Sequence, residues 1–152
     1  SPLVTRDVDL LVALAARGAV WLSVTVETDQ DPVPGLPRHA TPIARRLEAL
    51  AAFRAAGVRT QAAVSPVLPI GDLPGFAARL DAACDRVIVD HYLVGDGSQG
   101  LRTRRTPFVD LLVAAGHERW TRLEVLEEVR AGLAARLGDE RVLVSCAGFN
   151  AI

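Results

Sequence analysis

Three consecutive side chains that can exchange protons, Asp90, His91 and Tyr92, end an apolar run in the second half of the chain. Barrel enzymes collect polar groups at the carboxyl ends of their parallel strands, so a histidine there suits a proton donor or a cofactor contact. The alternative is a strand histidine whose ring is satisfied by hydrogen bonds within the fold. We interpret His91 and Tyr92 as the candidate catalytic residues.

Two other chemistries are disfavoured at this cluster. A metal site needs further ligands, and the two other histidines have no spacing that completes a site with Asp90 and His91. A serine hydrolase would recruit Ser23 or Ser145, but neither serine is flanked by the glycines of a nucleophile elbow. Adjacent side chains on a strand also point to opposite faces. We therefore expect no metal ligands and no hydrolase triad.

A proline-rich loop with the sequence VSPVLPIGD occupies residues 64–72, between an apolar run and a helical pattern. Its two prolines fix φ near about −65° and remove two backbone donors, so the loop cannot pair as a sheet strand. A stiff apolar loop that follows a strand lies where α/β folds bind their ligands. The sequence therefore predicts a binding loop here.

Helices and strands alternate in the predicted secondary structure. Strands are expected at 20–26, 58–64, 86–92 and 141–145, and helices at about 5–16, 41–57, 74–84, 106–116 and 121–138. Strands separated by helices pair in parallel through right-handed crossovers. We predict one α/β domain over residues 1–152, a partial (β/α) barrel with parallel strands.

The first predicted strand has two chemically different faces. Alternation along the strand places Val20, Leu22, Val24 and Val26 on an aliphatic face. It places Trp21, Ser23 and Thr25 on the other, more polar face. In a barrel, the aliphatic face would pack on helices and the Ser/Thr face would point inward. The alternative is that strand ends are polar only because they meet solvent.

The composition narrows the function classes. Charges nearly cancel, with a net charge of −1, so no global field attracts nucleic acid. All 17 basic residues are arginines, which excludes a Schiff-base or P-loop lysine in this chain. No apolar run reaches the roughly 18 residues of a membrane span, and no signal-peptide pattern is present. We expect a cytoplasmic protein with no membrane association and with reduced thiols.

Several segments resemble, in order, radical S-adenosylmethionine proteins of the spore-photoproduct-lyase type, often labelled DNA repair photolyases. SPLVTRDVDLL at 1–11 is similar to the segment after the family's third strand, and LSVTV at 22–26 to its fourth strand. Residues 44–57 resemble the next helix, and 64–72 the fifth strand with its proline-rich loop. The resemblance implies the carboxyl-terminal portion of a (β/α)₆ barrel.

The resemblance also implies cofactors and site residues. Family members bind S-adenosylmethionine across the strand ends beside a [4Fe–4S] cluster, which cleaves it to a 5′-deoxyadenosyl radical. Ser23 and Thr25 would approach the methionine or ribose part of the cofactor. The adenine would pack against Ser65 and the loop that follows, with the implied contacts Pro66, Val67, Leu68 and Ile70. His91 and Tyr92 would line the far wall.

The chain departs from the family at the cluster. The family's three cysteines in a CxxxCxxC loop are absent, and Cys84 and Cys146 lie 62 positions apart. Two separated cysteines cannot replace three clustered ones. We therefore expect the chain to be inactive alone, with the cluster ligands in a missing amino-terminal half of the barrel.

Partners and an alternative function follow from the remaining features. A half barrel leaves strand 20–26 as an exposed edge, which favours a homodimer through that strand. Arg102, Arg104 and Arg105 could contact the phosphates of a nucleic acid, or simply form a solvated loop. The alternative function is a small α/β binding or assembly module without redox chemistry.

Overall fold

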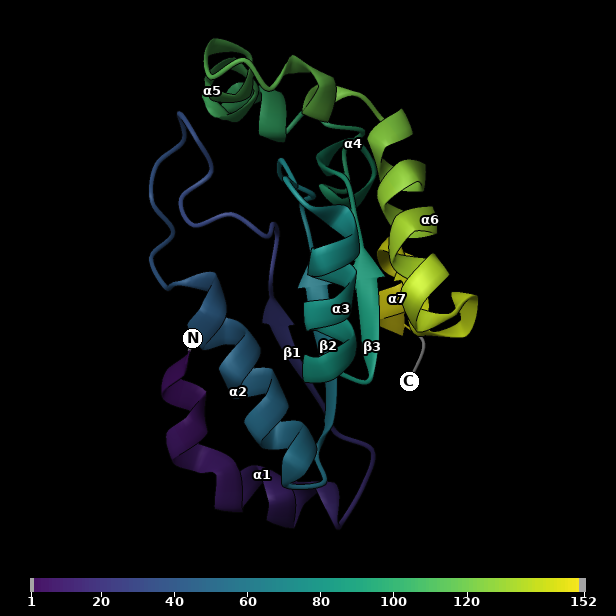
Figure 1. The fold of residues 1–152 in the computed structure, drawn as a ribbon. Coiled ribbons are helices and arrows are strands. Elements are labelled where there is room, and N and C mark those ends of the chain that lie inside the picture. The colour runs from purple at the N-terminus through teal and green to yellow at the C-terminus, as the bar shows by residue number, and fades with distance from the viewer. Residues whose placement is uncertain (1, 151–152) are drawn as a thin grey trace.

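Four parallel strands form the centre of the protein in a computed structural model that describes residues 2–150. The strands are adjacent in chain order and pair in parallel. Figure 1 shows the arrows of β1, β2 and β3 pointing the same way. Their bounds are β1 Trp21–Thr25, β2 Arg59–Val64, β3 Arg86–Val89 and β4 Val142–Val144. The predicted α/β class with parallel strands is therefore confirmed, and the four-stranded parallel sheet is compatible with part of an α/β barrel.

Helices connect the strands, as the alternating pattern predicted. The α-helices are α1 Val8–Ala15, α2 Ile43–Ala55, α3 Leu73–Ala83, α4 Tyr92–Gly95, α5 Phe108–Ala114, α6 Glu124–Leu137 and α7 Ser145–Asn150. Short 3₁₀ segments are η1 Pro2–Asp7, η2 Thr103–Arg105, η3 Glu118–Thr121 and η4 Asp139–Arg141. Within the described residues, no helix combines the length and apolarity needed to cross a bilayer.

One face of the sheet carries the hydrophobic core. Helices α2, α3 and α6 pack on this face (Figure 1). Their buried side chains, including Leu50, Leu80 and Leu133, meet the alternate strand residues Val24, Ala62, Val64, Val87, Val89 and Val142. The aliphatic face predicted for the first strand is thus the helix-covered face.

The opposite face of the sheet is polar near β1. Ser23 and Thr25 are exposed there, and the strand register places Ser23 beside Gln61. The Arg86 guanidinium lies 3.7 Å from the centroid of the Trp21 ring and donates to Gln61 Oε1 at 2.8 Å. On the β3 and β4 side, α7 covers this face. The Ser/Thr side of β1 is therefore left open.

Thr41 before Pro42 has the sequence pattern of an N-cap, and Thr121 three residues before Glu124 that of a capping box, but neither predicted cap forms. Thr41 does not cap α2; instead, Asp31 reaches from the preceding loop and its Oδ2 accepts from the Ile43 N–H at 2.8 Å. The capping box at Thr121 does not form either, because Thr121 ends η3 and its hydroxyl donates to the Glu118 carbonyl. A distant carboxylate thus replaces the local cap at α2, and at Thr121 the hydroxyl bonds within η3 instead of capping α6.

Two element boundaries also differ from the prediction. The third strand ends at Val89 rather than Tyr92, since His91 caps α4 and turns the chain away from the sheet. The last strand ends at Val144, and Ser145 begins α7, which the sequence did not predict. Ser145 has a φ of 49°, a left-handed conformation that breaks the strand sharply.

The core predicts a clear contrast between two leucines. Leu80 is 0 % exposed, whereas Leu10 on α1 is 71 % exposed. Leu80→Ala should lower the free energy of unfolding by about 2–5 kcal/mol, because it removes buried methyl groups and leaves a cavity. Leu10→Ala should change it by less than about 0.5 kcal/mol. Urea unfolding of both variants tests this, and equal losses would show that α1 belongs to the core.

Candidate functional site

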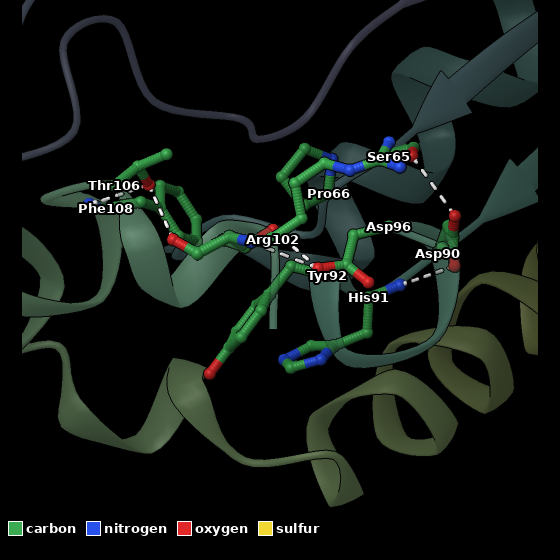
Figure 2. A pocket seen from close by; sticks show the side chains of 11 residues that line it. Ser65, Pro66, Asp90, His91, Tyr92, Asp96, Arg102, Thr106 and Phe108 are labelled. Carbon is green, nitrogen blue, oxygen red and sulfur yellow. Dashed lines mark hydrogen bonds between the residues drawn. The ribbon is translucent and has the colours of Figure 1, made fainter. Parts of the chain in front are cut away.

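A cavity of about 400 Å³ opens at the carboxyl ends of β2 and β3. Three segments line it: Ser65 and Pro66 after β2, residues 90–96 after β3, and residues 102–108 in the loop leading to α5. Figure 1 shows α4 and α5 lying beyond the tips of the strand arrows, where they flank this end of the sheet. The close view in Figure 2 shows the lining side chains.

Ser65, Asp90 and Ser145 form a row across three strand ends. Val64 pairs with Val89 and Val89 with Val144, so the next residue of each strand falls in the same row. The Ser65 hydroxyl donates to Asp90 Oδ2 over a long 3.5 Å (Figure 2). Ser145 is buried, and its hydroxyl has no hydrogen-bond partner of regular geometry within the described chain.

The Asp90 carboxyl is buried without a positive partner. It is 5 % exposed, and no ion pair joins it to any residue that the structure describes. Burial raises its pKa, and the hydroxyls of Ser145 and Ser65 and the His91 backbone N–H oppose that shift only in part. A raised pKa on a carboxyl that lines a cavity is typical of a functional group.

Gly95 makes room for this carboxyl. A Cβ built at Gly95 would overlap the Asp90 carboxylate oxygens, so the first turn of α4 passes directly against them. The Gly95 N–H donates to the His91 carbonyl at 2.8 Å, which holds the turn in that position. A glycine is therefore required here by close approach, because any side chain would displace the carboxyl.

Both ring nitrogens of His91 are engaged within the fold. Nδ1 accepts from the Leu93 N–H at 3.3 Å, and Nε2 lies 3.2 Å from the Trp120 carbonyl, which assigns the proton to Nε2. The ring is fully buried, and burial lowers the pKa of His91, so the neutral form is favoured. This geometry fits a structural histidine, and its catalytic role stays a prediction.

Tyr92 and Phe108 supply the aromatic wall of the cavity. Their ring centroids are 5.6 Å apart in an edge-to-face arrangement. The Tyr92 hydroxyl points away from the strand ends and donates to the Thr121 carbonyl at 3.0 Å. The cavity therefore meets the Tyr92 ring, while its hydroxyl is occupied elsewhere.

Asp96 organises the loop that closes one side of the cavity. Burial opposes its ionisation, but hydrogen bonds from Gly100, Ser98 and Thr103 hold the pKa of Asp96 well below its ordinary value. Its two oxygens accept from three backbone N–H groups and two hydroxyls of this loop at 2.8–3.1 Å. An ionised carboxylate so bonded fixes residues 96–103 as a rigid unit.

Arg102 is carried to the cavity by that loop. Figure 2 shows its side chain passing Pro66 and ending near Ser65. No acidic residue pairs with it among those described. The cavity thus combines aromatic rings, one guanidinium and the buried Asp90 carboxyl.

The residues assigned to the cofactor by resemblance are only partly brought together. Ser65 and Pro66 line the cavity with His91 and Tyr92. The other assigned residues lie elsewhere. Val67 is buried, and its N–H donates to the Asp90 carbonyl. Leu68 lines a second cavity of about 220 Å³, Ile70 packs on the core, and Ser23 and Thr25 are exposed on β1.

Sequence reasoning did not assign Asp96, Thr106 and Phe108 to the site. Asp96 comes from a loop that showed no periodicity, and Thr106 and Phe108 begin a predicted helix, so nothing local indicated that these segments fold back onto the strand ends. Asp90 was considered only as a metal or triad partner. The close approach of Gly95 to its carboxyl identifies Asp90 as part of the site, and this approach is visible only in the three-dimensional structure.

The described residues offer no ligand set for a metal or a cluster. No group of three or more Cys, His, Asp or Glu side chains comes together among them. Cys84 is buried, its thiol donates to the Leu80 carbonyl, and burial raises its pKa to about 11. Cys146 is exposed on α7. A thiol that stays protonated is a poor metal ligand.

Gly95→Ala should disturb the cavity specifically, because the added Cβ would displace the Asp90 carboxyl. We expect a loss of about 1–3 kcal/mol in the free energy of unfolding and altered NMR signals from Ser65 and His91. Gly18→Ala is the matched control, since a Cβ there meets no atom within 4 Å. A neutral Gly95→Ala would show that α4 adapts freely.

Asp90→Asn should change the pH dependence of stability. Since the folded pKa is raised, native Asp90 holds a proton that the unfolded chain has already released, and wild-type stability falls as pH rises through that window. Asparagine has no such titration. The stability of the variant relative to wild type should therefore increase as pH rises from the ordinary pKa of an aspartate, about 3.9, through the raised pKa of folded Asp90. Urea unfolding across that range measures it, and a constant difference would contradict the raised pKa.

Comparisons of the chain with protein-family models, with curated proteins and with solved structures yield no match. The family resemblance therefore rests on its sequence motifs alone. The main indication of function is accordingly the cavity. It has aromatic walls at the carboxyl ends of parallel strands and holds a buried carboxyl and an arginine that forms no ion pair with any described residue.

Proposed function

We propose that this chain is the carboxyl-terminal portion of a radical S-adenosylmethionine barrel protein of the DNA-repair-photolyase-like type. In this proposal, the cavity between β2 and β3 receives the adenosyl part of S-adenosylmethionine. One observation carries it: four residues that the resemblance assigns to this ligand or its far wall, Ser65, Pro66, His91 and Tyr92, line the same cavity.

The size and chemistry of the cavity support an adenosyl ligand. Its volume of about 400 Å³ lies within the usual range of small-molecule sites. Pro66 and the rings of Tyr92 and Phe108 offer apolar surface to a planar base. Asp90 and Thr103 add polar groups that could bond the edge of the base or the ribose hydroxyls.

The cluster, in contrast, does not fit the residues of this chain. The two thiols are separated, one is buried and protonated, and no ligand group assembles in the described part. In the parent protein, the cluster would supply the electron that cleaves the cofactor. The residues of this chain would bind the adenosyl group, orient it and exclude water from it.

The open edge of the sheet supports a missing partner. Among the described strands, β1 pairs only with β2, and Ser23 and Thr25 on it are exposed. An unpaired parallel strand is a template for another strand. We propose that the missing amino-terminal half of the barrel pairs there, and that in its absence a second copy of the chain can do so.

A small-molecule-binding module without redox chemistry is the second candidate. It is favoured by the completeness of the cavity, because its walls, Asp90 and the loop held by Asp96 all come from this chain. Such a site would function without further strands. The two candidates differ in whether S-adenosylmethionine is the ligand.

Titration with S-adenosylmethionine, followed by ¹H–¹⁵N NMR, tests the proposal. We expect a dissociation constant on the order of millimolar, because the chelation to iron that anchors the amino acid part is absent. The backbone signals of Ser65, His91 and Thr103 should shift first. Signals that move only at the amino-terminal ends of the strands would contradict the site.

Two phenylalanine variants sharpen the experiment. Phe108→Ala removes a wall of the cavity and should weaken binding by about tenfold, the cost of losing an aromatic contact to the base. Phe149→Ala lies outside the cavity, is partly exposed and should leave binding unchanged. If S-adenosylmethionine does not bind at about ten times that concentration, the redox-free module becomes the better description.

A further inference from the structure

The Asp90 carboxyl has unused hydrogen-bonding capacity at the cavity. Oδ1 accepts from the His91 N–H at 2.9 Å, whereas Oδ2 accepts from the Ser65 hydroxyl over a long 3.5 Å, and the Ser145 hydroxyl also faces the carboxyl. A carboxyl group has about four acceptor positions when ionised, and one donor with acceptors when protonated. Oδ2 therefore has positions left for a group that enters the cavity.

The fold keeps this carboxyl in place at a cost. Burying a carboxyl without a cation is unfavourable. Position 95 must also be a glycine, because a side chain there would overlap the carboxyl. Its position in the row between Ser65 and Ser145 fixes its direction across the strand ends. An apolar side chain would satisfy the core more simply, so the arrangement points to a contact with a ligand.

The groups that face Asp90 are mostly neutral. Just after β2 and at the start of α7 these are the hydroxyls of Ser65 and Ser145, and next to it in the chain it is His91, whose neutral form is favoured. From α4, Gly95 brings no side chain. Asp96 and Arg102 line the same cavity, but the carboxylate of Asp96 is already bonded to its own loop. Among the described residues, no arginine or histidine forms an ion pair with Asp90.

We propose that Asp90 contacts the ligand as a neutral carboxylic acid, with its hydroxyl donating and its carbonyl accepting. The site then selects a ring edge on which an acceptor nitrogen lies beside an N–H donor, as in adenine. This deepens the proposed function, on which the choice of an adenosyl ligand rests. The raised pKa of Asp90 agrees with this role, because it extends the pH range in which the donor is present.

The chemistry resembles a familiar pairing. An asparagine or glutamine amide bonds an adenine edge with one donor and one acceptor, and a good bidentate pair discriminates by about tenfold or more. A neutral carboxyl offers the same two groups side by side. An ionised carboxylate offers two acceptors and no donor. It would place an acceptor oxygen against the acceptor nitrogen of the ring and lose the hydrogen bond to that nitrogen.

Binding of adenosine and of purine riboside to the wild-type chain tests this directly. Purine riboside keeps the ring and lacks the exocyclic N–H, so it should bind at least about tenfold more weakly than adenosine. The wild-type affinity for adenosine should fall as pH rises through the raised pKa of Asp90. Equal affinities for the two nucleosides, or an affinity independent of pH, would overturn the inference.

Three variants separate the role of the carboxyl from its effect on folding. Asp90→Asn keeps one donor and one acceptor, so it should bind adenosine within about threefold of the low-pH wild type and show no dependence on pH. Asp90→Ala should bind at least about tenfold more weakly at every pH. Asp110→Asn, the same substitution at an exposed position of α5 that does not line the cavity, should behave as wild type. NMR spectra before titration show whether each variant is folded.

Measuring the binding of S-adenosylmethionine to the wild type and the same variants, over the same pH range, distinguishes the two proposals. If it binds but neither Asp90 variants nor pH alter its affinity, the proposed function stands and the role of Asp90 is refuted. If adenosine binds as described above but S-adenosylmethionine does not, Asp90 reads the base and the proposed cofactor is wrong. If neither ligand binds, both are refuted.

Discussion

The burial of the Asp90 carboxyl is the constraint around which this end of the protein is organised. The parallel register of β2, β3 and β4 brings the carboxyl level with two serines, and α4 must pass it at a residue without a side chain. His91 then bonds through both ring nitrogens to hold α4 and the segment at Trp120. The cavity exists because the chain turns out of the sheet immediately after Asp90, instead of continuing as a strand.

The sheet itself is asymmetric, and this asymmetry decides where a ligand can bind. Helices α2, α3 and α6 bury one face in a continuous aliphatic core, which makes the strand positions rigid. The other face carries Arg86 in contact with both Trp21 and Gln61, and α7 covers it on the β3 and β4 side. A rigid scaffold with one uncovered, polar face suits an element of a larger barrel, and its strand ends provide fixed positions for side chains.

The sequence predicted the order and type of the main elements because their signals are local. Alternation along 20–26 separated the core side of β1 from its open side correctly, and glycines marked the helix ends at 57 and 138. The caps were wrong where the partner is distant: Asp31 lies twelve positions before Ile43, and no local pattern reveals that contact. The end of β3 was also wrong, because a histidine with two backbone partners reads in sequence like any strand residue.

The candidate site shows the same division between local and distant information. Strand-end residues such as Ser65 and His91 are identifiable, since the carboxyl end of a parallel strand follows from the element pattern. Phe108 and Arg102 are not, because they reach the cavity only through a loop whose shape is set by the Asp96 carboxylate. The roles of two neighbouring residues, His91 and Asp90, are also the reverse of those expected from the sequence. His91 satisfies its hydrogen bonds within the fold, while Asp90 keeps capacity for a ligand, so chemistry at this site follows from which polar groups the backbone has left unsatisfied.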